Sequence, residues 1–283
     1  MSLFISPHIR RLIDLSLDED QIGADFTSAA FFAESSNKAY FIAKSDLVVA
    51  SLDIIPAVFH RVDPALHFEP LCKDGDVIKK GTILARAHGP TISLLRAERS
   101  ALNFFQRACG IATKTHTFVK TLDNSSIRIA DTRKTLPGYR ELDKYAVSCG
   151  QGFNHRFALS GGIMLKDNHI AAAQGDVKKA IDKVKAIAPH TLKIEVEVER
   201  IEQIQPAIDA GAEIIMLDNM TTKDMHEASA LIRKNNPRII IEVSGNVTLD
   251  RLPELGTIDV DVISTGAITH SIEAADISMK FEK

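Results

Sequence analysis

The chain has 283 residues, of which 45% are hydrophobic and 25% charged, and its formal net charge is −3. These values are ordinary for a soluble globular protein, and no apolar run approaches the ~20 residues that span a bilayer. A slightly acidic balance, with no Trp and no interleaving of aromatic and basic residues, lacks the signature of nucleic-acid binding. We therefore expect neither a membrane nor a nucleic acid as a partner.

The first residues, Met1–His8, lack the basic start and the long apolar stretch of a secretory signal. Cys72, Cys109 and Cys149 cannot form a complete disulfide framework, and none lies in a CxxC pair. We expect these cysteines to be small buried apolar side chains. A reducing compartment fits this usage best, so a cytoplasmic protein is expected.

The first part of the chain mixes helical and β-like patterns. Apolar residues at helical spacing predict helices over 8–17 and 52–62. Short β-like runs occupy residues 39–43, 47–50 and 67–71. The stretch 73–85 has the pattern of a turn, a strand, a second turn and a second strand. Its sequence resembles biotinyl and lipoyl carrier domains but lacks their modified lysine, so a structural β element is expected. Residues 94–119 predict one or two long helices, with a domain boundary near Gly110.

After Gly110, short apolar runs alternate with helical patterns. The runs occupy residues 127–130, 162–165, 192–198, 213–217, 238–243 and 260–263. Helices are expected over residues 170–188, 199–210, 221–234 and 248–255. Strand and helix repeated in this way predict a parallel sheet with right-handed crossovers. Several such units favour a (β/α) barrel, although six or seven strands fall short of eight. The strand ends would then share one mouth, which would collect Asp131, Lys166, Glu195, Asp218, Ser244 and Gly266.

Cations concentrate between residues 131 and 169 of this slightly acidic chain. They are Arg133, Lys134, Arg140, His155, Arg156, Lys166 and His169. This concentration favours a local anion site over a solvated charged face, because Arg suits carboxylates and phosphates and Lys supplies a compact charge. Glycine-containing tips at 243–246 and 263–270 precede helices, and late barrel loops of this kind often bind phosphate; ordinary turns are the alternative.

Glu195 and Asp218 are expected at or near neighbouring strand ends. Two carboxylates there can serve as acid and base, or hold Mg²⁺ together with phosphate oxygens; structural ion pairs are the alternative. Lys166 could instead form a Schiff base if its pKa were depressed, which would indicate an aldolase-like lyase.

These motifs resemble the quinolinate phosphoribosyltransferase family, also called nicotinate-nucleotide pyrophosphorylase. The resemblance is strongest in the segments 131–138, 154–156, 166–169 and 242–246. It implies an α/β protein with an N-terminal α/β sandwich over 1–110, joined by a tail over 271–283, and an incomplete, seven-stranded α/β barrel over 111–270. It also implies a homodimer or higher homo-oligomer with shared active sites. The implied reaction joins quinolinate to phosphoribosyl pyrophosphate with Mg²⁺, giving nicotinate mononucleotide, pyrophosphate and CO2.

The resemblance also implies residue roles. Arg133, His155, Arg156 and Lys166 would surround the two carboxylates of quinolinate, with Arg99 reaching in from a partner subunit. Lys134 would contact phosphate or pyrophosphate, and Glu195 and Asp218 would lie near the ribose hydroxyls and Mg²⁺. The remaining expected substrate-binding residues are Thr132, Ser244, Gly245, Asn246, Ser264, Gly266 and His270. Lys134, Lys166, Glu195 and Asp218 are the expected catalytic residues, acting by positioning and electrostatics because no nucleophile is evident.

Departures from the family pattern are modest. Gln151, Phe153 and Ser160 replace residues that are frequent beside the base pocket, which affects the expected base specificity. A molybdenum-associated phosphoribosyltransferase-like paralogue is the alternative within the fold. The Schiff-base lyase and a non-catalytic anion-binding barrel are the alternatives from other classes.

Overall fold

A computed structural model describes residues 2–32 and 34–282. The chain divides into two compact units: the first takes 1–116, 135–151 and 268–283, and the second takes 117–134 and 152–267. The sequence prediction had placed 135–151 in the barrel domain. This segment instead groups with the first unit, because α5 (Arg140–Cys149) is fixed there by an Arg107–Asp143 ion pair of 2.7 Å and a 2.6 Å bond from the Tyr145 hydroxyl to Asp74.

The first unit is built on an antiparallel sheet of four strands in the order β12-β1-β5-β3. These strands are β12 (Ile277–Phe281), β1 (Ser36–Ala43), β5 (Ile83–Pro90) and β3 (His67–Pro70). The C-terminal tail therefore supplies an edge strand, paired with β1 from Ala39↔Phe281 to Ala43↔Ile277. A second, two-stranded sheet pairs β2 (Leu47–Val48) with β4 (Val77–Ile78).

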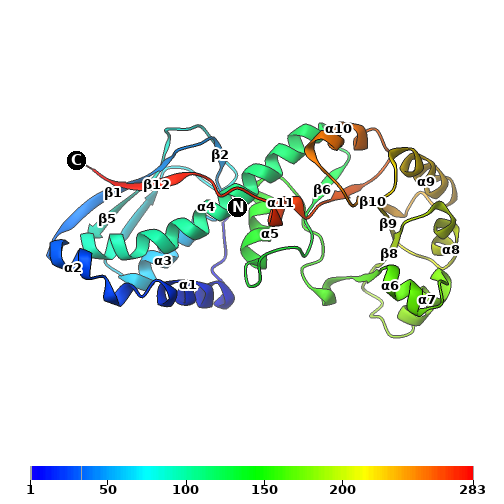
Figure 1. The fold of residues 1–283 in the computed structure, drawn as a ribbon, viewed down its shortest axis with the longest axis horizontal. Coiled ribbons are helices and arrows are strands. Elements are labelled where there is room, and N and C mark those ends of the chain that lie inside the picture. Colours follow the sequence, from blue (N-terminus) through cyan, green and yellow to red (C-terminus); the bar gives the residue numbers. More distant parts are fainter. Residues whose placement is uncertain (1, 33, 283) are drawn as a thin grey trace. The chain divides into compact units, whose positions relative to one another are not determined.

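Helices cover one face of the four-stranded sheet (Figure 1). They include α1 (Pro7–Glu19), α2 (Phe26–Phe32), α3 (Ile54–Val62) and the first part of α4 (Thr91–Leu122). The spacing of Ile9, Ile13 and Leu17 puts all three on the buried side of α1, and the Ser6 hydroxyl caps that helix by accepting the Ile9 N–H at 3.2 Å. A short 3-10 turn, η1 (Ile22–Ala24), follows α1.

Helix α4 is one continuous helix of 32 residues, not two. The domain boundary expected near Gly110 lies inside this helix, and the two compact units divide slightly later, at 116/117; the boundary itself stays a prediction. Gly110 has a different role, because a Cβ at this position would lie 2.2 Å from the carbonyl oxygen of Glu273. Glycine lets the C-terminal tail pass directly against the helix backbone.

The second unit contains a parallel sheet in the order β6-β11-β10-β9-β8-β7. Its strands are β6 (Arg128–Ala130), β7 (Ile163–Leu165), β8 (Ile194–Val198), β9 (Ile214–Asp218), β10 (Ile240–Ser244) and β11 (Val262–Ser264). Six of the seven expected strands are thus assigned among the described residues. The chain at Phe153 adds only a single parallel bridge to Ala130, on the free side of β6. The α/β class and the barrel-like sheet are confirmed.

Helices connect these strands. They are α6 (Asp167–Ala172), α7 (Val177–Lys185), α8 (Ile204–Asp209), α9 (Thr222–Asn235) and α10 (Leu252–Leu255), with 3-10 turns η2 (Leu159–Gly161), η3 (Ile201–Gln203) and η4 (Leu249–Arg251). A further helix, α11 (Ala267–His270), follows the last strand of this sheet, β11. The helix expected over 170–188 is in fact two helices, because Gln174 and Gly175 adopt φ of 66° and 80° between them. None of the helices in the described ranges is long and apolar enough to cross a membrane.

Candidate active site

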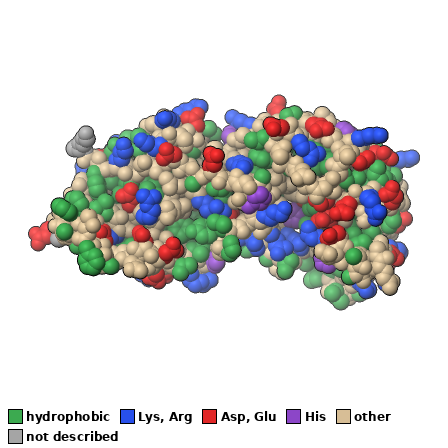
Figure 2. Space-filling model, in the orientation of Figure 1, with side chains coloured by type: hydrophobic (Ala, Val, Ile, Leu, Met, Phe, Trp, Pro, Cys, Tyr) green, Lys and Arg blue, Asp and Glu red, His purple; other side chains and the backbone are tan. Residues whose placement is uncertain are grey.

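A cavity of about 430 Å³ opens at the C-terminal ends of the second unit's strands. We call it the mouth. It is lined by Thr132, Arg133, Lys134, His155, Arg156, Met164, Lys166, Glu197, Met216, Asp218, Asn219, Ser244, Gly245, Asn246 and Ser264. Parallel strands end at one edge, so short polar tips from distant parts of the sequence meet there. On the face in Figure 2, Lys and Arg side chains gather on one side of a hollow in this unit and Asp and Glu side chains on the other.

Most of the sequence-predicted site residues line the mouth, and four do not. Arg99 and His270 belong to the first unit. Gly266 follows β11 but is not among the lining residues. Glu195 lines a different cavity of the second unit, of about 390 Å³. The roles expected for Arg99, Gly266 and His270 stay predictions, and Glu195 is considered with Glu197 below.

Two guanidinium groups face the same space in the mouth. Arg156 donates to the carbonyl of Gly162 at 2.8 Å and to the sulfur of Met164 at 3.6 Å. Burial, followed by the neighbouring charge of Arg133, lowers the pKa of Arg156. The two guanidinium groups repel each other in a half-buried space, and an anion bound between them would offset this repulsion.

The mouth carboxylates are Glu197 and Asp218. The expectation that Glu195 reaches the mouth is wrong: Glu195 and Glu197 both point inward from β8, and Glu197 is the one nearer the strand's C-terminal end. Two residues along a strand correspond to roughly 6.6 Å of depth. The missed signal was the alternation Glu195-Val196-Glu197-Val198, in which the last inward acid lies closest to the edge.

Lys166, which follows β7, forms an ion pair with Glu197, with 2.5 Å between Nζ and Oε2. The Lys166 side chain is 45% exposed, whereas that of Glu197 is 10% exposed. The ammonium group is therefore held at the rim of the mouth by a carboxylate fixed on the sheet.

The tips of β9 and β10 pack against each other. Gly245 has φ +82°, and a Cβ there would lie 2.2 Å from Asn219 Oδ1. The Asn219 amide N–H donates to the carbonyl of Ser244 at 3.1 Å, and the Asn219 side chain donates to Asp218 at 2.7 Å. Asn219 and Asn246 also have positive φ, at 54° and 49°. The glycine thus lets the tip of β10 lie directly against the residues that hold Asp218.

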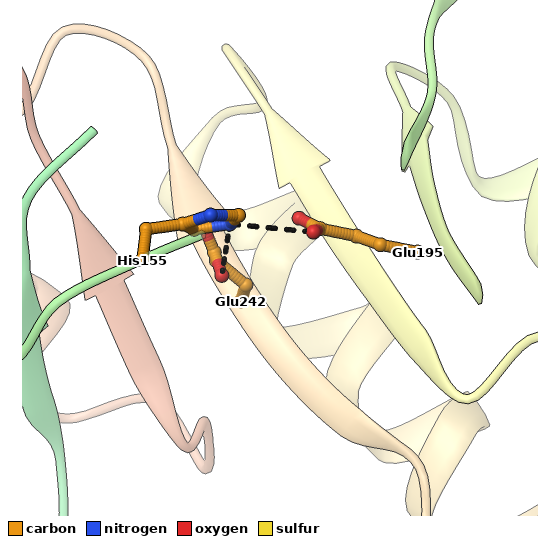
Figure 3. A group of neighbouring side chains, drawn as sticks. All are labelled: His155, Glu195 and Glu242. Carbon is orange, nitrogen blue, oxygen red and sulfur yellow. Dashed lines mark ion pairs between the residues drawn. The ribbon is translucent and has the colours of Figure 1, made fainter. Parts of the chain in front are cut away.

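Three ionisable groups meet beneath the mouth (Figure 3). His155 Nε2 lies 3.3 Å from Glu195 Oε2 and 3.6 Å from Glu242 Oε2. Both glutamates are only 3% exposed, and one carboxyl oxygen of Glu195 is buried without a hydrogen-bond partner among the described residues. Burial, together with the charge of Glu195, raises the pKa of Glu242 to about 7. The sequence expectation placed His155 at the substrate but did not bring it to Glu242.

Asp131 also lies away from the mouth, contrary to expectation. Its side chain is fully buried and accepts the backbone N–H of His155 at 2.8 Å. The carboxylate therefore fixes the loop that carries His155 and Arg156, because a buried charge is retained only with such partners.

The chain matches two family profiles over most of its length. Residues 25–109 match "Quinolinate phosphoribosyl transferase, N-terminal domain", and residues 111–280 match the C-terminal domain of the same enzyme. A "Probable nicotinate-nucleotide pyrophosphorylase [carboxylating]" of Bacillus subtilis (strain 168) is 44% identical over 271 residues, covering 96% of this chain and 92% of the relative. A Synechocystis protein of the same name is 40% identical, covering 93% of this chain and 89% of the relative.

A solved structure gives the same result. The crystal structure of NadC from Streptococcus pyogenes superposes with a TM-score of 0.93 at 39% sequence identity, and all of each chain is covered.

Proposed function

The chain belongs to the quinolinate phosphoribosyltransferase family, and we infer from this membership that it transfers the phosphoribosyl group of phosphoribosyl pyrophosphate to quinolinate. Loss of CO2 then gives nicotinate mononucleotide, and pyrophosphate is the second product. The enzyme is a carboxylating nicotinate-nucleotide pyrophosphorylase of NAD biosynthesis. We place it in the cytoplasm, in keeping with its cysteine usage.

The observation that carries this proposal is the pair of guanidinium groups in the mouth. Quinolinate has carboxylates on adjacent ring carbons, and Arg133 and Arg156 offer planar forks to two such groups. Burial and then the charge of Arg133 lower the pKa of Arg156, and an anion bound between the two guanidinium groups would offset their repulsion. Lys166 adds a third positive charge at the rim. A substrate with one carboxylate would leave part of this charge unpaired, which supports selectivity for quinolinate over nicotinate.

The phosphate end of the second substrate suits the tips of β10 and β11. Ser244, Gly245 and Asn246 line the mouth with a backbone that glycine allows to be approached closely. Ser264 contributes a buried hydroxyl that lies next to Glu242. Lys134, with Thr132 bonded to its backbone N–H at 3.0 Å, supplies a cation for the pyrophosphate.

Glu197 and Asp218 fit Mg²⁺, because they line the same cavity and offer hard carboxylate oxygens. When bound there with the substrate, Mg²⁺ would offset negative charge on the pyrophosphate oxygens. Glu195, the ligand expected from the sequence together with Asp218, lines a different cavity, so this proposal puts Glu197 in its place.

The residues of the mouth act mainly by positioning. As the bond from the ribose carbon to pyrophosphate breaks, positive charge develops on the ribose, and the carboxylates of Glu197 and Asp218 stabilise this charge. The quinolinate nitrogen then forms the new bond to that carbon. The bond from the ring to the neighbouring carboxylate breaks next; CO2 leaves, the electron pair stays on the ring carbon beside the charged nitrogen, and a proton replaces the carboxylate.

The deciding assay supplies quinolinate, phosphoribosyl pyrophosphate and Mg²⁺ to the purified enzyme and measures CO2 and nicotinate mononucleotide. Equal amounts of both products are expected, with little turnover when nicotinate replaces quinolinate. The matched control is Lys134→Ala, which keeps the fold but lacks the pyrophosphate contact. Turnover of nicotinate as fast as quinolinate, or no CO2 at all, would contradict the proposal.

We also propose a homodimer or higher homo-oligomer in which Arg99 of one subunit serves the mouth of its partner. Arg99 is an exposed cation on α4, a helix that is otherwise largely apolar and buried. Two inactive variants, Arg99→Ala and Lys134→Ala, should regain activity after their subunits re-assort, because one site of each mixed dimer is then intact. Exchange of subunits without any return of activity would exclude a shared site.

A further inference from the structure

The buried group formed by His155, Glu195 and Glu242 lies behind the mouth, and the proposed reaction gives it no role so far. Glu195 projects from β8 and Glu242 from β10, and both point toward the ring of His155 (Figure 3). The ligand atoms of the three side chains lie within 4.8 Å of one another. One carboxyl oxygen of Glu195 is buried without a partner among the described residues, and Glu242 has the Ser264 hydroxyl close enough to lower its pKa. Leaving such an oxygen unpaired is costly, so a role for the group is expected.

The backbone that carries His155 is fixed from both sides. The Phe153 N–H donates to the carbonyl of Ile129 at 2.8 Å, and the Asp131 N–H donates to the carbonyl of Phe153 at 3.0 Å. The His155 N–H then donates to the buried carboxylate of Asp131 at 2.8 Å. The position of the ring is thus set by β6, and only its proton remains to be assigned.

The hydrogen bonds assign that proton to Nε2. The backbone N–H of Arg156 donates to His155 Nδ1 at 2.7 Å, so Nδ1 must carry a lone pair. In a neutral ring the proton is then on Nε2, directed at Glu195 and Glu242. The two carboxylates act against burial to raise the pKa of His155, but a doubly protonated ring would lose the bond from the Arg156 amide. A metal bound at Nε2 would require the opposite tautomer.

We propose that Glu195 and Glu242 are positioning residues: their buried carboxyl groups hold His155 with its proton on Nε2, and this ring holds the backbone of Arg156. The guanidinium of Arg156 is braced by Gly162 and Met164, and it has further N–H groups for a substrate carboxylate. The part of this proposal that concerns quinolinate rests on the proposed function. The part that concerns the ring does not.

Two double variants test the proposal. Glu195→Gln with Glu242→Gln keeps an acceptor oxygen at each position, whereas Glu195→Met with Glu242→Met keeps the bulk but removes the acceptors. The Gln pair should stay within about threefold of the wild-type KM for quinolinate. The Met pair should raise that KM about tenfold or more, as expected for a lost hydrogen bond, with the KM for phosphoribosyl pyrophosphate and kcat little changed. Equal quinolinate KM values for the wild type and the Met pair, or a loss of kcat at unchanged KM, would overturn the positioning role.

A second measurement needs no substrate and no variant. Nitrogen-15 NMR of the wild-type enzyme at neutral pH should show His155 as the neutral Nε2–H tautomer, assigned by its absence in His155→Gln. A ring protonated on Nδ1 would overturn the proposal even if quinolinate is turned over. So would a transition metal that purifies with the wild type and is lost in the Gln pair. Because the tautomer is read without ligand, its outcome is independent of whether quinolinate is the substrate.

Discussion

Replacing Gly110 by Ala should destabilise the protein, although Ala normally stabilises the interior of a helix by about 1 kcal/mol relative to Gly. The reason lies in the C-terminal tail, which crosses α4 at this position. A Cβ on residue 110 would lie 2.2 Å from the Glu273 oxygen, 3.1 Å from its carbonyl carbon and 3.2 Å from Ala274 Cα. All three are backbone atoms, so no flexible side chain can give way.

The tail is also tied to α4 next to this contact, through Gln106. The Ala275 N–H donates to the carbonyl of Gln106 at 2.9 Å, and the Gln106 side chain donates to the carbonyl of Ile277 at 2.7 Å. Overpacking costs ~1–3 kcal/mol, and contacts this short belong at the upper end, so a net loss of about 2 kcal/mol is expected after the helix gain is subtracted.

Urea unfolding followed by circular dichroism measures this loss as a lower midpoint with an unchanged m-value. Gly23→Ala is the control, because a Cβ at Gly23 meets nothing within 4 Å. A midpoint for Gly110→Ala that equals or exceeds that of the wild type would refute the close-approach argument.

Four further outcomes are expected. Arg156→Ala should raise the KM for quinolinate by roughly 10- to 100-fold, since a charge-assisted bond contributes ~1.5–3 kcal/mol; an unchanged KM would exclude this contact. Gly245→Ala, which drives a Cβ into Asn219, should raise the KM for phosphoribosyl pyrophosphate more than that for quinolinate. The pKa of Glu242 is about 7 in the folded state against an ordinary value of 4.5, so between these pH values the folded state keeps a proton that the unfolded state has lost. The free energy of unfolding should therefore fall by about 3 kcal/mol as pH rises through this window. Glu242→Gln should reduce the corresponding fall in urea midpoints between about pH 4.5 and 8. Borohydride with a carbonyl substrate should leave the protein mass unchanged, because a trapped adduct at Lys166 would indicate a Schiff base.

The sequence predicted the parallel sheet well, because buried strands are continuous apolar runs that differ from the helices around them. The runs at 213–217 and 238–243 nearly coincide with β9 and β10. The depth of a side chain within the barrel was harder to predict from the sequence. Alternation shows that Glu195 and Glu197 face the same side, but it does not show which of them lies at the rim.

Contacts between distant segments could not be predicted from local patterns. The ring of His155 is oriented by Glu242, which is far away in the sequence, so nothing near either residue indicates the pairing. Residues 135–151 contain a clear helix, but only the partners of Asp143 and Tyr145 assign that helix to the first unit. Gln151 and Phe153, expected beside the base pocket, are both exposed and do not line the mouth, so their effect on base specificity stays a prediction.

The pairing of β12 with β1 has a consequence for how the protein is made. The first three strands of this sheet are complete once Pro90 has been synthesised, but the fourth arrives about 190 residues later. At ~5–20 residues per second, the ribosome needs roughly 10–40 s to supply it. Throughout that interval the nascent chain carries a β1 edge whose N–H and C=O groups await Ile277–Phe281, an open template for mispairing with neighbouring chains. The sheet of the first unit therefore cannot be completed during translation until β12 has been synthesised. If translation stops before that point, the released chain has an unpaired β1 edge.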